Sequence, residues 1–340
     1  MRRDAEKPEM GGSNMRSMLG AMLLAGAVLA APDAGAADAL KPWRHGLLEA
    51  KSDAGIMLMP SRDGFAEKQG LKLEIVQVKS DIIGLQALLA GELDSYEGGI
   101  GGSVKVAARG TDVKIVGCYW LAVPHGIFVR NQLSSVAEIK GKSLAISAPG
   151  AMPDILAHAL LEKNGIAAAD IKFVNLGSDL DRFKALAAGV VDAAVVSGEY
   201  VPIAEKQGVK LLVPGREVLP NYLRTCIHMR GKTIQERREV AVHFLATEIS
   251  GLRYALSHRA ESLELTQLLT EAKADDPRAA YLFDDVIRSG AVDPEMPIPM
   301  DKIAWMQDLL VKSGDMAQAG EVSRMVDPSL RLQALEILGR

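Results

Sequence analysis

The chain has 340 residues, of which 48% are hydrophobic and 24% are charged, so it is long enough and apolar enough to fold into two lobes of ordinary domain size. Its formal net charge is −4, and no run of basic residues alternates with aromatic ones. Nucleic acid and anionic membrane surfaces are therefore not expected partners.

The first 36 residues are predicted to be an export signal. An apolar stretch over residues 18–31 is followed by Ala-Gly-Ala at 34–36, the small-x-small pattern of a cleavage site. The stretch is too short to span a bilayer. Cleavage near Ala36 predicts a periplasmic protein, whose precursor starts at either Met1 or Met15.

After the signal, strand-like runs alternate with helical ones, which indicates βαβ units and a parallel sheet. A glycine-rich turn at 98–102 separates one strand from the helix that follows it. In chain order, the pattern predicts strands at 46–50, 71–78, 113–120 and 126–130, and helices at 56–69, 82–90 and 103–109.

A second block opens with Ser135 and Glu138, which have the spacing of a capping box at the start of a helix. Another capping box at Thr233 and Glu236 opens a mostly helical tail, predicted to pack on the first lobe, with a separate helical domain as the alternative. The block between them is predicted to hold strands at 143–147, 171–174, 192–196 and 224–229, with helices at 153–163 and 181–188.

One pattern occurs twice, as ALLAGELD at residues 87–94 and ALAAGVVD at 185–192. In each copy a helix ends at a glycine, which accepts the left-handed conformation of a helix C-terminus, and a strand follows. The repeat predicts two similar α/β lobes, with a cleft between them that suits a small molecule.

With this repeat, four further segments resemble the solute-binding proteins of ABC importers, in the alkanesulfonate, nitrate and thiamine-pyrimidine (NMT1/THI5-like) binding group. The segments are 54–65, 107–116, 139–142 and 160–166. The resemblance implies a type II periplasmic-binding-protein fold, with two parallel-rich sheets flanked by helices and joined by two crossover strands. It implies lobe 1 at 37–123 and 226–340 and lobe 2 at 124–225, closing on a ligand.

The same resemblance implies an inner-membrane ABC permease as the partner of a monomeric receptor, with no cofactor. An enzyme on the same scaffold, of the pyrimidine-synthase kind, and a ligand-sensing partner of a membrane receptor are the alternatives. No nucleophile motif or metal-ligand spacing is visible in the sequence, so neither catalysis nor a metal site is expected.

In open α/β sheets, ligands lie beyond the carboxyl ends of the strands, and this rule selects most of the candidate binding residues. Met57 is added because it suits an apolar pocket, and His125 and Arg224 are added for positive charge near the crossover strands. The candidates are Ser52, Asp53, Gly55, Met57, Glu97, Gly99, Gly101 and Trp120 in lobe 1, and His125, Ala148, Gly150, Met152, Asp154, Ser197, Glu199, Tyr200 and Arg224 in or next to lobe 2.

Three of these residues favour a partly apolar, aromatic or heterocyclic ligand. Trp120 is able to stack on a planar solute, although core packing explains it nearly as well. Met57 and Met152 suit an adaptable pocket, although methionines on an amphipathic helix more often belong to the core. Glu97 and Glu199 are the better acidic candidates, because neither is needed as a helix cap.

Other candidates have structural alternatives. Asp154 is well explained as a helix cap, and His125 and Arg224 either bind an anionic group or form hydrogen bonds at the hinge. Cys118 and Cys226 fall on the strands that pass between the lobes, where a disulfide is possible but two buried free thiols are the favoured interpretation.

Overall fold

The computed structural model describes residues 39–49, 51–62, 64–273 and 275–339. The predicted export signal, its cleavage site and both candidate start positions lie outside the described residues. Within the described part of the chain, no helix is both long and apolar enough to cross a membrane.

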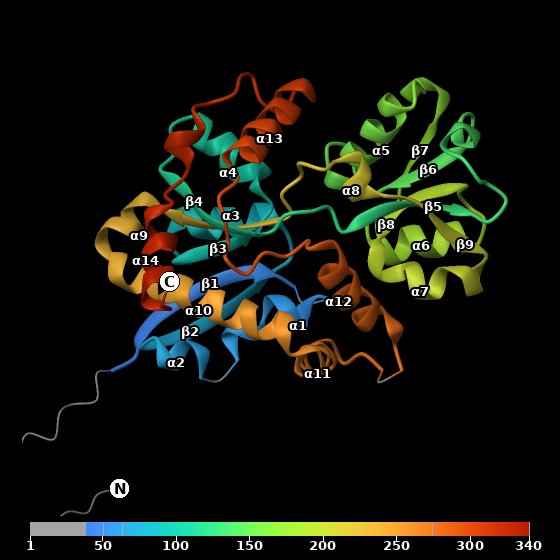
Figure 1. The fold of residues 1–340 in the computed structure, drawn as a ribbon. Coiled ribbons are helices and arrows are strands. Elements are labelled where there is room, and N and C mark those ends of the chain that lie inside the picture. The colour runs from blue at the N-terminus through green and yellow to red at the C-terminus, as the bar shows by residue number, and fades with distance from the viewer. Residues whose placement is uncertain (1–38, 50, 63, 274, 340) are drawn as a thin grey trace, which may run out of the picture. The chain divides into compact units, whose positions relative to one another are not determined.

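The first sheet contains four strands that run in one direction and one that runs the other way. Its spatial order is β2-β1-β3-β10-β4, and β10 is antiparallel to both of its neighbours (Figure 1). The strands are β1 (Lys41–Leu48), β2 (Leu71–Val78), β3 (Ser95–Gly98), β4 (Val113–Trp120) and β10 (Thr225–Arg230).

The second sheet repeats this topology. Its order is β7-β6-β8-β5-β9, and β5 is the strand that is antiparallel to its neighbours. The strands are β5 (His125–Arg130), β6 (Ser143–Ile146), β7 (Lys172–Asn175), β8 (Ala193–Ser197) and β9 (Val209–Pro214). The predicted two-lobed α/β fold is therefore confirmed, with mixed sheets in which parallel neighbours and one reversed strand are combined.

Helices flank both sheets (Figure 1). In chain order they are α1 (Ala54–Met57), α2 (Phe65–Lys68), α3 (Asp81–Ala90), α4 (Ile100–Ala108), α5 (Met152–Lys163), α6 (Asp179–Ala187), α7 (Val201–Ala204), α8 (Gly215–Val218), α9 (Gly231–Glu236), α10 (Arg238–Ser257), α11 (Arg259–Thr270), α12 (Pro277–Ser289), α13 (Met300–Lys312) and α14 (Ser329–Ile337).

Each sheet has its own core. Helix α10, in the helical tail, packs on the first sheet, where Phe244 stacks on Trp43 with ring centroids 5.2 Å apart. The second sheet is covered by α5 on one face, where Leu156 and Ile127 belong to one core cluster, and by α6 and α7 on the other, where Phe183 and Phe128 belong to another (Figure 1). Part of the helical tail thus shares a core with the first sheet.

The repeated sequence has the same structural role in both sheets. Gly91 and Gly189 both have positive φ, +83° and +71°, and end the helices α3 and α6. The carboxylate that closes each repeat then accepts the backbone N–H of a neighbouring strand: Asp94 from Arg44 at 2.9 Å and Asp192 from Ser143 at 3.0 Å. A helix end is thereby fixed to the start of the adjacent strand.

Some predicted elements were wrong. The helix expected at 56–69 is broken into α1, a 3-10 turn at Met59–Ser61 and α2, because Pro60 opens the turn and Gly64 adopts φ of +98°. The helix expected from residue 103 begins at Ile100, which leaves Gly99 as its N-cap. Thr233 lies inside α9 and caps nothing, and β9 was not predicted at all.

The prediction of two free thiols is also wrong. Cys118 and Cys226 face each other on the adjacent strands β4 and β10 and form a disulfide. Both residues are fully buried, so the bond lies within the core of the first sheet.

Candidate functional site

A cleft of about 1230 Å³ lies at the carboxyl edge of the second sheet and is lined from both halves of the fold. The second sheet supplies residues that follow β6, β7 and β8, the first supplies the segment after β1, and α11 and α12 close one side. Of the predicted binding residues, those that line this cleft are Ser52, His125, Met152, Glu199 and Tyr200.

A partly buried carboxylate organises one part of the cleft lining. Asp179, in the first turn of α6, lies 3.1 Å from His125 Nε2, 2.6 Å from Arg182 Nη2 and 3.0 Å from the backbone nitrogen of Ser197. Burial opposes its ionisation, but the charges and hydrogen bonds of His125 and Arg182 outweigh burial and hold the pKa of Asp179 well below its ordinary value. Asp179 is therefore a fixed negative charge in the cleft lining.

Sequence reasoning missed Asp179 and Arg182. Their positions matched an ordinary helix start, in which Ser178 caps the helix by accepting from the backbone of Asp181. The available signal was an arginine on the apolar face of a helix, since Arg182 is almost fully buried and donates from Nε to the carbonyl of Val195 at 2.6 Å.

Glu199 connects the two lobes. It follows β8, and its carboxyl group forms a hydrogen bond with Ser52, which follows β1. Burial raises the pKa of Glu199, and the nearby negative charges of Asp53 and Asp179 add to this, although the Ser52 hydrogen bond and Arg278 act in the opposite direction. This carboxyl group therefore binds a proton more readily than an ordinary glutamate does.

The aromatic side chain in the cleft is Tyr200. Its ring lies under the guanidinium of Arg278, 5.5 Å from the centroid, and Arg278 is itself paired with Asp276 at 2.6 Å. Asp276 also caps α12 by accepting the backbone N–H of Arg278 at 3.0 Å. The start of α12 is therefore held against Tyr200, a residue of the second lobe that lines the cleft.

Three predicted residues meet outside the cleft lining. The Arg224 guanidinium lies over the Trp120 ring, 3.9 Å from its centroid, and pairs with Asp53. Trp120 is only 1% exposed, so its core-packing alternative describes its position. Arg224 Nη1 is buried without a hydrogen-bond partner among the described residues, which leaves one donor for a further group. A ligand-binding role for these residues remains a prediction.

Several of the remaining candidates make local contacts in the described chain, and a ligand-binding role for them stays a prediction. Gly55 lets α1 approach α11, because a Cβ there would lie 1.8 Å from the carbonyl oxygen of Ser262. Gly99 donates to Asp81 at 2.9 Å, and Asp154 accepts from Gly150 at 2.8 Å. Candidates that do not line the cleft are Asp53, Gly55, Met57, Glu97, Gly99, Gly101, Trp120, Ala148, Gly150, Asp154, Ser197 and Arg224.

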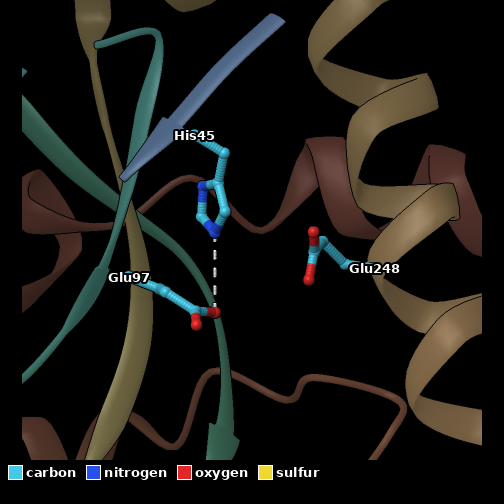
Figure 2. Close-up of side chains that lie close together, drawn as sticks. All are labelled: His45, Glu97 and Glu248. Carbon is cyan, nitrogen blue, oxygen red and sulfur yellow. Dashed lines mark ion pairs between the residues drawn. The ribbon is translucent and has the colours of Figure 1, made fainter. Parts of the chain in front are cut away.

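A second polar group lies under the first sheet. His45, Glu97 and Glu248 come from β1, β3 and α10, and each offers one potential ligand atom within 4.8 Å of the others (Figure 2). Spacing along the sequence gave no sign of this cluster, since its members are far apart in the chain and only the packing of α10 brings them together.

Two mixed sheets, with a cleft lined by residues from both, form the fold of the periplasmic solute-binding proteins. The sequence model of the family described as NMT1/THI5 like matches residues 52–262. The chain belongs to the NMT1/THI5-like family. No curated protein matches it.

Solved structures with the same fold have low sequence identity to this chain. The periplasmic sulfonate-binding protein SsuA of Methylobacillus flagellatus KT is 17% identical with a TM-score of 0.71, over 88% of this chain and 96% of that one. The aliphatic sulphonate-binding SsuA of Escherichia coli is 21% identical with a TM-score of 0.69, over 84% and 92%. The desulfurization enzyme DSZB is 12% identical with a TM-score of 0.66, over 88% and 99%.

Proposed function

We propose that this protein is the periplasmic substrate-binding component of an ABC importer, which captures a small organic solute by lobe closure and delivers it to an inner-membrane permease. The observation that carries the proposal is the cleft of about 1230 Å³ lined by Lys51 and Ser52 from the first lobe and by Asp179 and Glu199 from the second. A solute in contact with both lobes favours the closed form in proportion to its preference for that form.

The proposed lobes are 37–123 with 226–340, and 124–225. They fit the two sheets, because the strands β5 to β9 form the second sheet and all other described strands form the first. The receptor is proposed to act as a monomer and to leave its ligand unchanged.

The lining favours a solute with a polar or charged group on a partly apolar body. Of the three side chains that suggested an apolar or aromatic ligand, only Met152 lines the cleft, while Trp120 and Met57 pack against the core of the first sheet. Lys51 and Glu199 offer groups of opposite charge to the polar part of the solute. An aromatic or heterocyclic body remains compatible with contacts to Met152 and Tyr200.

A thermal-shift screen of purified residues 37–340 against sulfonates, aromatic acids, pyrimidines and amines tests the proposal. A ligand at 100 times its Kd should raise the free energy of unfolding by about 2.7 kcal/mol. Glu199→Gln should weaken that ligand at least tenfold, whereas Glu205→Gln, an exposed acid of the same lobe, should leave its Kd unchanged. Mass spectrometry before and after incubation measures turnover.

Two results would count against the receptor role. The first is the absence of any shift across the panel, together with no trapped molecule in the protein as purified. The second is conversion of a bound compound, which would favour an enzyme on this scaffold, as the likeness to a desulfurization enzyme allows. A permease and an ATPase encoded beside the gene would favour transport over a sensing role.

A further inference from the structure

The buried cluster beneath the first sheet contains one imidazole and two carboxyl groups. His45, Glu97 and Glu248 are 2%, 1% and 2% exposed. Figure 2 shows the three side chains directed into a common space between the sheet and α10. None of the three lines the cleft assigned to the solute.

The strand register explains why two of them share a face. His45 on β1 pairs with Ser95 on β3, and Glu97 lies two residues further along β3, so its side chain projects on the same side as that of Ser95. Across this face runs α10, where Phe244 contacts the His45 ring with centroids 4.9 Å apart. Glu248 lies one turn after Phe244 and is carried to the same place.

His45 and Glu97 each have one side-chain polar atom without a hydrogen-bond partner among the described residues. The Nδ1 atom of His45 lies 2.7 Å from Ser95 Oγ, which also accepts from Trp43 Nε1 at 2.8 Å, so the ring is held in place. Its Nε2 atom has no hydrogen-bond partner among the described residues and lies 3.6 Å from Glu97 Oε2. Glu97 Oε2 accepts from the Tyr119 hydroxyl at 2.9 Å, whereas Oε1 has no partner in the described chain.

The charges around the cluster do not balance. Arg224, whose charge acts on Glu97, is paired with Asp53. Two carboxylates buried without a cation are very unfavourable, so the cluster must bind either a proton or a metal ion.

We propose that His45, Glu97 and Glu248 bind a divalent transition-metal ion, with Zn²⁺ as the first candidate. One imidazole nitrogen and two carboxylate oxygens form a three-ligand set that Zn²⁺ uses with a water molecule as the fourth ligand. The imidazole argues against Mg²⁺ and Ca²⁺, which prefer oxygen ligands. Tetrahedral ligands at about 2.0–2.1 Å are roughly 3.3 Å apart, close to the separation of His45 Nε2 and Glu97 Oε2.

The site would be structural rather than catalytic. Ser95 already has the position of the outer partner that orients a metal-binding histidine. An ion there would join β1 and β3 to the middle of α10, and two positive charges would neutralise both carboxylates. This inference does not depend on the transport role, since the cluster and the solute cleft have separate residues.

Metal titration of the untagged chain 37–340 tests the proposal. After chelation and dialysis, Co²⁺ should bind with one ion per chain, give the intense visible absorption of a low-coordinate site, and raise the melting temperature. Zn²⁺ should displace it and abolish the colour. Failure of the wild-type protein to take up any of Zn²⁺, Co²⁺, Mn²⁺ or Ni²⁺ overturns the proposal without the need for a variant.

Variants locate the ion. Glu248→Gln should abolish the Co²⁺ absorption and the melting shift, while Glu239→Gln, on the same helix with a side chain 73% exposed, should retain both. His158 and Asp154, 3.2 Å apart on the surface of α5, are the competing site, so loss of the signal in His158→Gln instead would overturn the assignment. If neither protein binds an ion and the Glu248→Gln variant is more stable than the chelated wild type, then a proton neutralises the two carboxylates. That result would overturn the metal site.

Discussion

His228 shows how burial alone decides the charge of a side chain. It lies on β10 with 0% exposure, its ring stacked near Tyr96 with centroids 6.0 Å apart. Its Nε2 atom lies 3.4 Å from the Gly98 carbonyl oxygen, and Nδ1 has no partner in the described chain. Burial lowers the pKa of His228 from 6.5 to about 4, although the Gly98 carbonyl and the charge of Asp81 oppose the change. The imidazole is therefore neutral in the folded protein.

The pH dependence of stability should reveal this histidine. Between the unfolded value of 6.5 and the folded value of about 4, the unfolded chain binds a proton that the folded chain does not. The free energy of unfolding should therefore fall on acidification through this window, by about 3 kcal/mol in total. Urea unfolding between neutral pH and about pH 4.5 measures the change.

A pair of variants isolates the contribution of His228. His228→Gln should flatten the dependence on pH in that window, whereas His158→Gln, whose side chain is 48% exposed, should leave it in place. Equal slopes in the wild-type protein and the His228→Gln variant would show that the pKa of this imidazole is not depressed.

In each copy of the repeated helix end, an arginine lies next to the terminal glycine. A Cβ at Gly91 would lie 2.8 Å from Arg230 Nη1, and one at Gly189 would lie 2.8 Å from Arg130 Nη1. These arginines end β10 and β5, the reversed strands of their sheets. The structural similarity of the two copies therefore extends beyond the repeated segments, to an arginine at the end of the reversed strand in each sheet.

Two glycine variants separate backbone strain from crowding. Gly189 and Gly208 have φ of +71° and +70°, and only the first has a side chain near its Cβ position. Gly208→Ala should destabilise the protein by about 1 kcal/mol through the left-handed conformation alone. Gly189→Ala should cost about 2 kcal/mol because Arg130 must also move. Denaturant unfolding measures both, and equal costs would show that Arg130 yields freely.

At the scale of the whole molecule, the second sheet is an insertion between β4 and β10 of the first, since the chain leaves after β4 and returns at β10. The disulfide between Cys118 and Cys226 joins these two strands across a sequence separation of 108 residues. A crosslink that closes so long a loop removes much conformational freedom from the unfolded chain.

Reduction should therefore destabilise the protein strongly. The expected loss is about 2–4 kcal/mol, read as a lower denaturant midpoint after dithiothreitol treatment. The double variant Cys118→Ala/Cys226→Ala should show a similar loss and no response to dithiothreitol. A wild-type midpoint that is insensitive to complete reduction, verified by thiol titration, would contradict this role.

Much of the fold was predictable from local patterns. The strand at 113–120 and the strand at 71–78 were predicted with the bounds that β4 and β2 have, and the repeat indicated two similar lobes. The strand β9 was missed because it lacks a clear alternation, with five of its six residues partly exposed. Its place is decided by pairing with β5, which no local pattern encodes.

The site was less predictable than the fold. The rule that ligands lie beyond strand ends found Ser52 and Glu199, because their positions follow from the sheet alone. It also selected Trp120, whose ring is covered by Arg224 from a distant part of the chain. The contribution of α11 and α12 to the cleft, and the approach of Glu248 to His45, depend on how helices pack after the sheets form. Such contacts leave no signature in residue spacing.

The bond between β4 and β10 also determines what a protease would leave behind. Because Cys118 and Cys226 lie on either side of the inserted sheet, a single cut anywhere between them opens a covalent ring without separating the pieces. Nicked protein should run as one band on a non-reducing gel and as two after reduction. A receptor clipped within its second lobe would therefore keep both fragments attached, with the disulfide still joining β10 to β4, the edge strand of the first sheet.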